Sequence, residues 1–194
     1  MWLKIALVAA AATPILHSLV LVLSGQNAVT EPISELSRAG WGGLHTLGLV
    51  LFGVAHVALA LELTGRGKGR LWFAGRLFLG ASGGLLFYVA FYFMSANPDV
   101  LRGPDANDPL WVVASLIGLS MGALQPGLSR YSQGLGLFSA LCLGLWLWLA
   151  VLALFVDDDW LGLYERTVGA VYVTWIIGIA SRLLKPGREE AGRA

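Results

Sequence analysis

The sequence has little charge and almost no cysteine. Only 13% of its 194 residues are charged, whereas a soluble domain has about 25%. Cys142 is the single cysteine, which excludes an intrachain disulfide and a cysteine-based metal cluster. The formal net charge is +1, without the basic excess that a nucleic-acid partner usually requires. We therefore expect no nucleic acid among its partners.

The motifs of common enzyme and cofactor classes are also absent. The sequence has no P-loop, GxSxG, HExxH or CxxC pattern. Its acidic stretches, 105–108 and 157–159, do not have the spacing of an EF-hand loop. No catalytic residue can be assigned from a motif, and we expect no cofactor.

Long apolar segments dominate instead. Hydrophobic residues make up 57% of the chain, and its mean hydropathy is +0.72. A helix needs roughly 20 apolar residues to cross about 30 Å of hydrocarbon. Six segments have about that length: Ile5–Ser24, Trp41–Leu63, Leu71–Met94, Leu110–Leu124, Leu135–Val156 and Leu161–Leu184. The predicted fold is an all-α polytopic membrane bundle of six transmembrane helices over residues 1–185, followed by a flexible cytoplasmic tail, 186–194.

The fourth segment is the shortest, and Pro126 marks its expected end because proline interrupts helices. Charge supports its assignment as a span. If the loops alternate sides, nine basic residues fall on one side: Lys4, Arg66, Lys68, Arg70, Arg130, Arg182, Lys185, Arg188 and Arg193. Only Arg38, Arg102 and Arg166 fall on the other. Basic residues collect in the cytoplasm, so both termini are predicted there.

Small residues recur at helical spacing in two of the spans. Gly80 and Gly84 lie in the third, and Ala114, Gly118 and Gly122 form a stripe on the fourth. Small residues let membrane helices approach closely. We expect the third and fourth spans to lie inside the bundle; the alternative is that the stripe faces a partner subunit.

Polar side chains in the spans are few, and each is a candidate for function because lipid burial is costly. Arg166, at the outer start of span six, needs an acceptor, which a carboxylate of Glu31 or Glu35 could provide. His45, Tyr92 and Glu165 are predicted at a similar depth. We therefore expect an outward-facing ligand pocket formed by Glu35, His45, Tyr92, Glu165 and Arg166. The alternative is a network at the headgroups that only ties loops to helices.

Two histidines are weak candidates for a metal or haem. His17 in span one and His45 in span two are predicted at similar depth, whereas His56 lies roughly 16 Å from His45 along the helix. No third ligand is evident. His17 has a simpler interpretation, because Pro14 leaves a backbone carbonyl unpaired that a nearby polar side chain can compensate. We therefore assign no metal.

Two stretches resemble the proteins of domain of unknown function 998. Ile33-Ser34-Glu35-Leu36-Ser37 is similar to the I-S-E/D-L element after that family's first span. Leu163-Tyr164-Glu165-Arg166, with Trp175 and the closing Arg182-Leu183-Leu184, resembles its last span. The resemblance implies a six-span bacterial or archaeal membrane protein, and hence the cytoplasmic (inner) membrane of a prokaryote. The family is distantly similar to DRAM-like proteins, some of which are tied to lipid handling.

The resemblance adds weight to Glu35, Glu165 and Arg166 but implies no reaction. One departure is that many members place a histidine early in span four, where this chain has Asp108-Pro109-Leu110-Trp111. The favoured interpretation is a non-catalytic protein that binds a lipid or small amphiphile, or an accessory subunit. Membrane lipids are the expected partners, with a homo-oligomer or a partner membrane subunit as further alternatives. An intramembrane lipid-modifying enzyme using His45 and Glu35, and a small transporter, are the competing classes.

Overall fold

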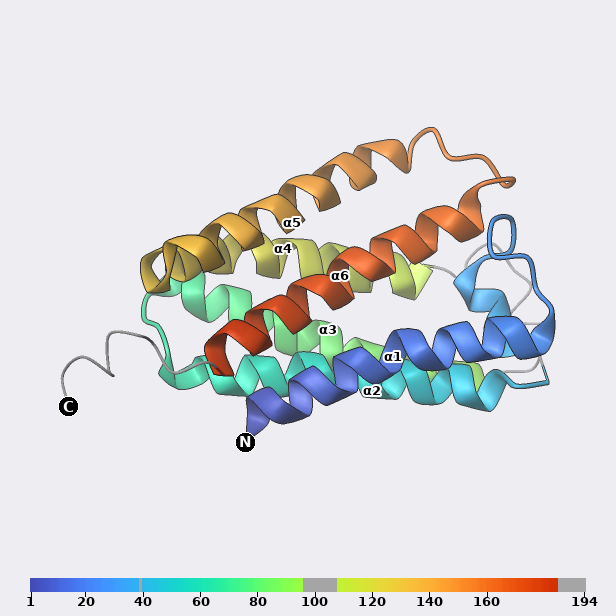
Figure 1. Ribbon diagram of the computed structural model, residues 1–194, viewed down its shortest axis with the longest axis horizontal. Coiled ribbons are helices and arrows are strands. Elements are labelled where there is room, and N and C mark those ends of the chain that lie inside the picture. The colour runs from blue at the N-terminus through green and yellow to red at the C-terminus, as the bar shows by residue number, and fades with distance from the viewer. Residues whose placement is uncertain (39, 96–107, 185–194) are drawn as a thin grey trace.

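The computed structural model describes residues 1–38, 40–95 and 108–184, and this part of the chain contains six long helices (Figure 1). Their bounds are α1 (Trp2–Ser24), α2 (Gly42–Glu62), α3 (Arg70–Ser95), α4 (Asp108–Tyr131), α5 (Gln133–Leu152) and α6 (Leu161–Leu184). Two short 3-10 helices, η1 (Ile33–Arg38) and η2 (Leu63–Gly65), follow α1 and α2. The predicted tail, 186–194, lies outside the described residues.

All six helices are long and apolar enough to cross a membrane. Large apolar side chains are exposed along their outer faces, for example Val8, Phe91 and Leu141. Such surfaces are stable only if lipid rather than water covers them. The predicted six-helix membrane bundle is confirmed.

The structure corrects the predicted limits of two spans. α4 does not end near Pro126 but continues through it to Tyr131. Membrane helices tolerate an internal proline. Gln125, just before it, joins α4 to α5 by donating from Nε2 to the Gly136 carbonyl oxygen at 2.9 Å. α5 ends at Leu152 rather than Val156, because residues 153–155 form turns.

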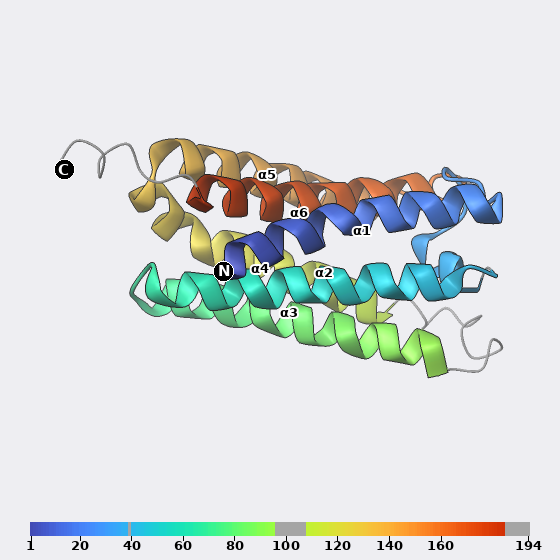
Figure 2. The ribbon, with the colours of Figure 1, turned by 60° about the horizontal axis from the view of Figure 1, so that its bottom comes forward.

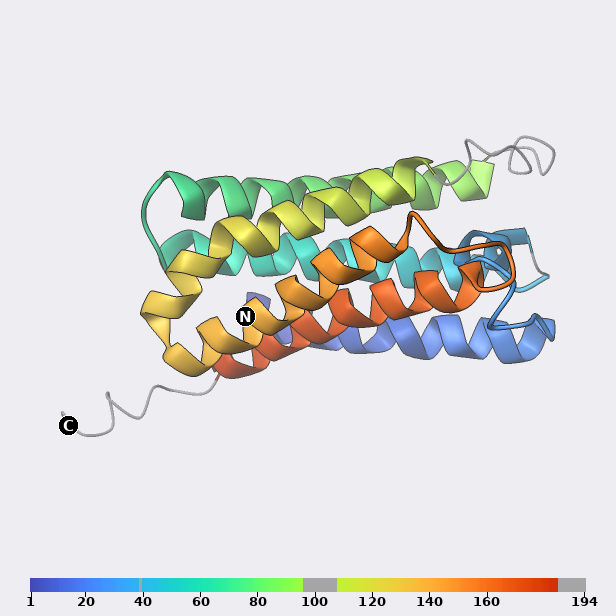
Figure 3. The same cartoon turned by 90° about the horizontal axis from the view of Figure 1, so that it is seen from above.

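The helices run alternately up and down, and each packs against its neighbours in the chain (Figures 1 and 2). α6 also packs against α1, which closes the six helices into a ring. The turns joining α2 to α3 and α4 to α5 lie at the end of the bundle where α6 finishes (Figure 3). The opposite end, which carries η1 and the α5–α6 connection, is called the η1 end below.

α2 is the most buried of the six spans, and α3 and α4, which were expected inside the bundle, are more buried than α1 and α5. α2 approaches α3 closely, because a Cβ added to Gly83 would lie 2.8 Å from the Gly53 carbonyl oxygen. In the predicted stripes, Gly84 and Gly122 are exposed, whereas Gly118 packs against the Trp146 ring. The close approach therefore depends on glycines that the spacing did not identify.

The direction of insertion stays a prediction, and it can be tested with single cysteines. Cys142 is buried, so it contributes little background to labelling. Lys68, between α2 and α3, and Asp158, between α5 and α6, are exposed at opposite ends of the bundle. A membrane-impermeant maleimide should label Asp158→Cys in intact cells and Lys68→Cys only after permeabilisation. The reverse pattern would contradict the charge-based topology; the unaltered chain is the control.

Candidate functional site

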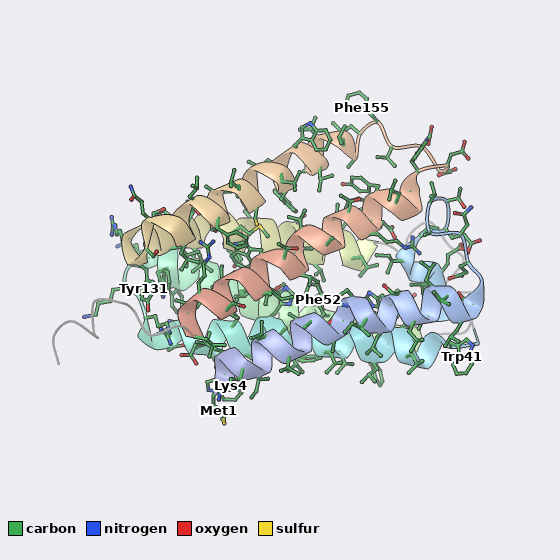
Figure 4. All side chains as sticks on the ribbon, viewed as in Figure 1. Met1, Lys4, Trp41, Phe52, Tyr131 and Phe155 are labelled. Atoms are coloured by element: carbon green, nitrogen blue, oxygen red, sulfur yellow. The ribbon has the colours of Figure 1, made fainter. Side chains whose placement is uncertain are left out.

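A cavity of about 470 Å³ lies within the ring towards the η1 end. Its walls come from α1, η1, α2, α3, α4 and α6. Most lining side chains are apolar: Leu21, Ile33, Leu36, Leu49, Phe52, Leu86, Leu110, Val113, Val168 and Val173. Phe52 lies near the middle of the bundle (Figure 4). The volume falls within the range of about 300–1,000 Å³ that is usual for small-molecule sites.

Arg166 of α6 lines the cavity and binds the loop that follows α1. Its Nη1 atom donates to the carbonyl oxygens of Ala28 at 3.0 Å, Glu31 at 2.7 Å and Gly162 at 2.9 Å. Its Nη2 atom is buried without a hydrogen-bond partner among the described residues. Backbone oxygens thus fix the Nη1 end of the guanidinium. The N–H donors of Nη2, at the other end, have no acceptor among the described residues.

Further bonds hold the same loop against the first turns of α6. The Ile33 N–H donates to Glu165 Oε2 at 2.7 Å, and the Leu163 N–H donates to the Val29 carbonyl at 2.9 Å. Gly162 permits the approach, since a Cβ there would lie 2.3 Å from the Glu31 carbonyl oxygen. We call these contacts between residues 28–33 and residues 162–166 the loop clasp. It positions Ile33 at the cavity wall.

Two histidines stack where α1 crosses α2. The rings of His17 and His45 have centroids 4.7 Å apart and planes inclined by 28°. Gly48 leaves room for them, because a Cβ there would lie 2.8 Å from His17 Nε2. His17 Nε2 and both ring nitrogens of His45 are buried without hydrogen-bond partners in the described structure. Such atoms are uncommon in proteins and point to strain or to a group that binds there.

From its exposed lining residues, we infer that the cavity opens to the surface between α1 and α6. Its exposed lining residues are Pro14 and Ser18 on α1, Trp111 on α4, and Ala170 and Thr174 on α6. Pro14 and Ala170 lie well inside their helices rather than at the ends. Because these helices are membrane-spanning, the opening faces the hydrocarbon of the bilayer.

The structure brings together only part of the predicted pocket. Glu165 and Arg166 line the cavity, whereas Glu35, His45 and Tyr92 do not. His45 is fully buried behind His17, and Tyr92 is stacked with Tyr88 on α3. Glu35 lies in η1, where its carbonyl oxygen accepts a hydrogen bond from Gln26.

Arg166 finds its acceptors in the predicted loop, but they are carbonyl oxygens rather than the carboxylates of Glu31 or Glu35 in the described contacts. The expected use of His17 to compensate for Pro14 is not what the contacts show either. Pro14 leaves the Ala10 carbonyl without its helical donor, and no described hydrogen bond joins His17 to it. The neighbouring Thr13 hydroxyl donates to the Ala9 carbonyl at 3.0 Å. His17 instead lines the cavity.

Sequence reasoning missed most of the cavity wall. Phe52, Leu36 and Gly169 look like ordinary residues of an apolar span, and no local pattern separates a lining residue from a packed one. One signal was available: Pro14, His17 and Ser18 place small and polar groups on one span. Among the described residues, no group of three or more metal-ligating side chains occurs.

Comparisons with known proteins give one family. The model of a family described as a protein of unknown function (DUF998) matches residues 5–182. No curated protein and no solved structure matches the chain. The match covers all six spans and every residue of the cavity.

Proposed function

The chain belongs to the DUF998 family, and from its cavity we propose that it binds a lipid or a small amphiphile among α1, α2, α4 and α6. The observation that carries the proposal is an apolar cavity of about 470 Å³ that has a polar end and opens between two membrane-spanning helices. Such a site suits a ligand with an apolar chain and a polar head.

The position of the opening favours a ligand that arrives from the bilayer. A water-soluble ligand would have to cross a wall of apolar side chains, whereas a lipid in the membrane meets the opening directly. By the distribution of basic residues, the cavity lies in the outer half of the membrane.

The arrangement is less suited to catalysis. The proposed enzyme residues, Glu35 and His45, both lie outside the cavity lining, and a reaction needs its acid or base within hydrogen-bonding reach of the substrate. We therefore favour binding without chemistry.

The proposal is tested by filling the cavity. Gly169 lines it, and a Cβ there would meet no atom within 4 Å, so Gly169→Phe should fill the space without displacing a helix. Native mass spectrometry of protein extracted from its own membrane should show a retained lipid or amphiphile. Gly169→Phe should reduce that adduct by about tenfold or more, because the side chain occupies the same volume.

Gly144→Phe is the matched control. Gly144 lies on the exposed face of α5, where an added Cβ also meets no atom within 4 Å, and it does not line the cavity. An adduct that persists equally in both variants would overturn the proposal, as would an unaltered protein that carries none. A retained protein subunit in place of a lipid would favour the accessory role.

A further inference from the structure

We infer that the cavity selects an amphiphile with an anionic headgroup, a carboxylate or a phosphate, with Arg166 Nη2 and His17 Nε2 as its donors. This inference rests on the proposed function and specifies the ligand class. Both residues line the cavity, and both atoms are buried without a hydrogen-bond partner among the described residues.

Arg166 restricts the chemistry of the ligand's headgroup more than His17 does. A guanidinium stays protonated and has donors only, so Nη2 needs an acceptor from the ligand. Because Nη1 is held by three carbonyl oxygens, the group is already oriented before a ligand arrives. Little conformational entropy is then lost on binding.

The neighbouring carboxylate does not use this donor in the described contacts. Glu165 Oε2 accepts the Ile33 N–H at 2.7 Å, within the loop clasp. Within the described structure, Arg166 Nη2 bonds to no carboxylate. An anionic headgroup would supply the charge-assisted hydrogen bond that this nitrogen lacks.

His17 supplies a second donor from another helix. Its ring is held by the stack with His45, and one of its tautomers carries a proton on Nε2. A headgroup with two or more acceptor oxygens can bond to α1 and α6 together, with its chain along the apolar wall near Phe52 and Leu86. Carboxylates and phosphates share this feature, whereas an alcohol or an amine does not.

The test compares four probes with the same twelve-carbon chain: laurate, dodecyl phosphate, dodecanol and dodecylamine. Each is added to the protein in phosphatidylcholine nanodiscs, and binding is measured by native mass spectrometry. The unaltered protein should bind laurate or dodecyl phosphate at least about tenfold more tightly than dodecanol, the effect expected of one charge-assisted hydrogen bond. The ranking of the two anionic probes distinguishes a fatty acid from a phospholipid-like ligand.

Arg166→Gln should reduce this preference while dodecanol still binds. Arg182→Gln is its control, because Arg182 also lies on α6 but outside the cavity lining, where it donates to the Gly134 carbonyl. If Arg166→Gln does not fold, His17→Phe keeps the ring without its nitrogens and should weaken binding of the anionic probes relative to dodecanol.

The outcomes separate the inference from the proposed function. Equal binding of all four probes to the unaltered protein overturns the inference and leaves amphiphile binding intact. A preference for dodecylamine also overturns it, because a cationic headgroup would bind the carboxylate of Glu165 instead. Binding of none of the probes overturns both.

Discussion

Gly83→Ala is expected to destabilise the bundle strongly, whereas the same change at the next residue, Gly84→Ala, should leave it folded. At Gly83 the new methyl group would lie 2.8 Å from the Gly53 carbonyl oxygen and 2.8 Å from Val57 Cγ2. The carbonyl oxygen is backbone, so α2 and α3 must separate to admit the methyl. Overpacking of this kind costs about 1–3 kcal/mol, and more where backbone must move.

The contact between Gly53 and Gly83 is reciprocal, so the clash that an added methyl group causes is difficult to remove by a small shift of one helix. A Cβ on Gly53 would lie 2.9 Å from the Gly83 carbonyl oxygen. Each glycine thus faces the other's backbone, and α2 is the most buried helix of the bundle. Moving α2 away from α3 would also disturb its contacts with α1, including the histidine stack.

Thermal unfolding in a mild detergent measures the difference between the two variants. Gly84 is the matched control because it is adjacent, exposed and without any atom within 4 Å of an added Cβ. Alanine is also the better helix former, by about 1 kcal/mol in soluble helices. Equal melting temperatures for Gly83→Ala and Gly84→Ala would show that the two helices do not approach as closely as described.

Arg166→Leu should lower the free energy of unfolding by about 3 kcal/mol, because hydrogen bonds from charged groups contribute about 1.5–3 kcal/mol each. The change removes the donor that holds the carbonyls of Ala28 and Glu31 against α6. Equilibrium unfolding measures the loss. Hydrogen exchange should rise mainly at residues 27–33, because the loop clasp loses its central contact.

Glu31→Gln is the informative control for this prediction. Arg166 bonds the backbone oxygen of Glu31, so removing the charge of the carboxylate should change stability by less than about 0.5 kcal/mol. If Glu31→Gln were as damaging as Arg166→Leu, an ion pair rather than the backbone would hold the loop.

The sequence was sufficient for the membrane bundle because span length and loop charge are local properties that can be read from residue order. The continuation of α4 through Pro126 was not predictable in this way, because proline interrupts most helices but is tolerated inside membrane helices. The Gly53–Gly83 contact was missed for a similar reason. Glycines occur in five of the six spans, and only the helix crossing determines which of them meet.

The candidate site was predictable only in its charged part. Arg166 was identified because a buried cation requires acceptors, but carbonyl oxygens have no side-chain signature, so carboxylates were expected instead. Glu35, His45 and Tyr92 were placed in the pocket from depth alone. Depth along a helix does not specify which way a side chain points, and these three lie outside the cavity lining.

The closure of the ring between α1 and α6 has a consequence for biosynthesis. The chain is made from its N-terminus, so five helices are complete while the seam between α1 and α5 is still open to the bilayer. α6 then brings the residues from Tyr164 to Thr174 that line one side of the cavity. Membrane lipid solvates that seam before α6 closes it. The last helix therefore completes the cavity, and a nascent chain that stops before Leu161 has five spans and an incomplete cavity.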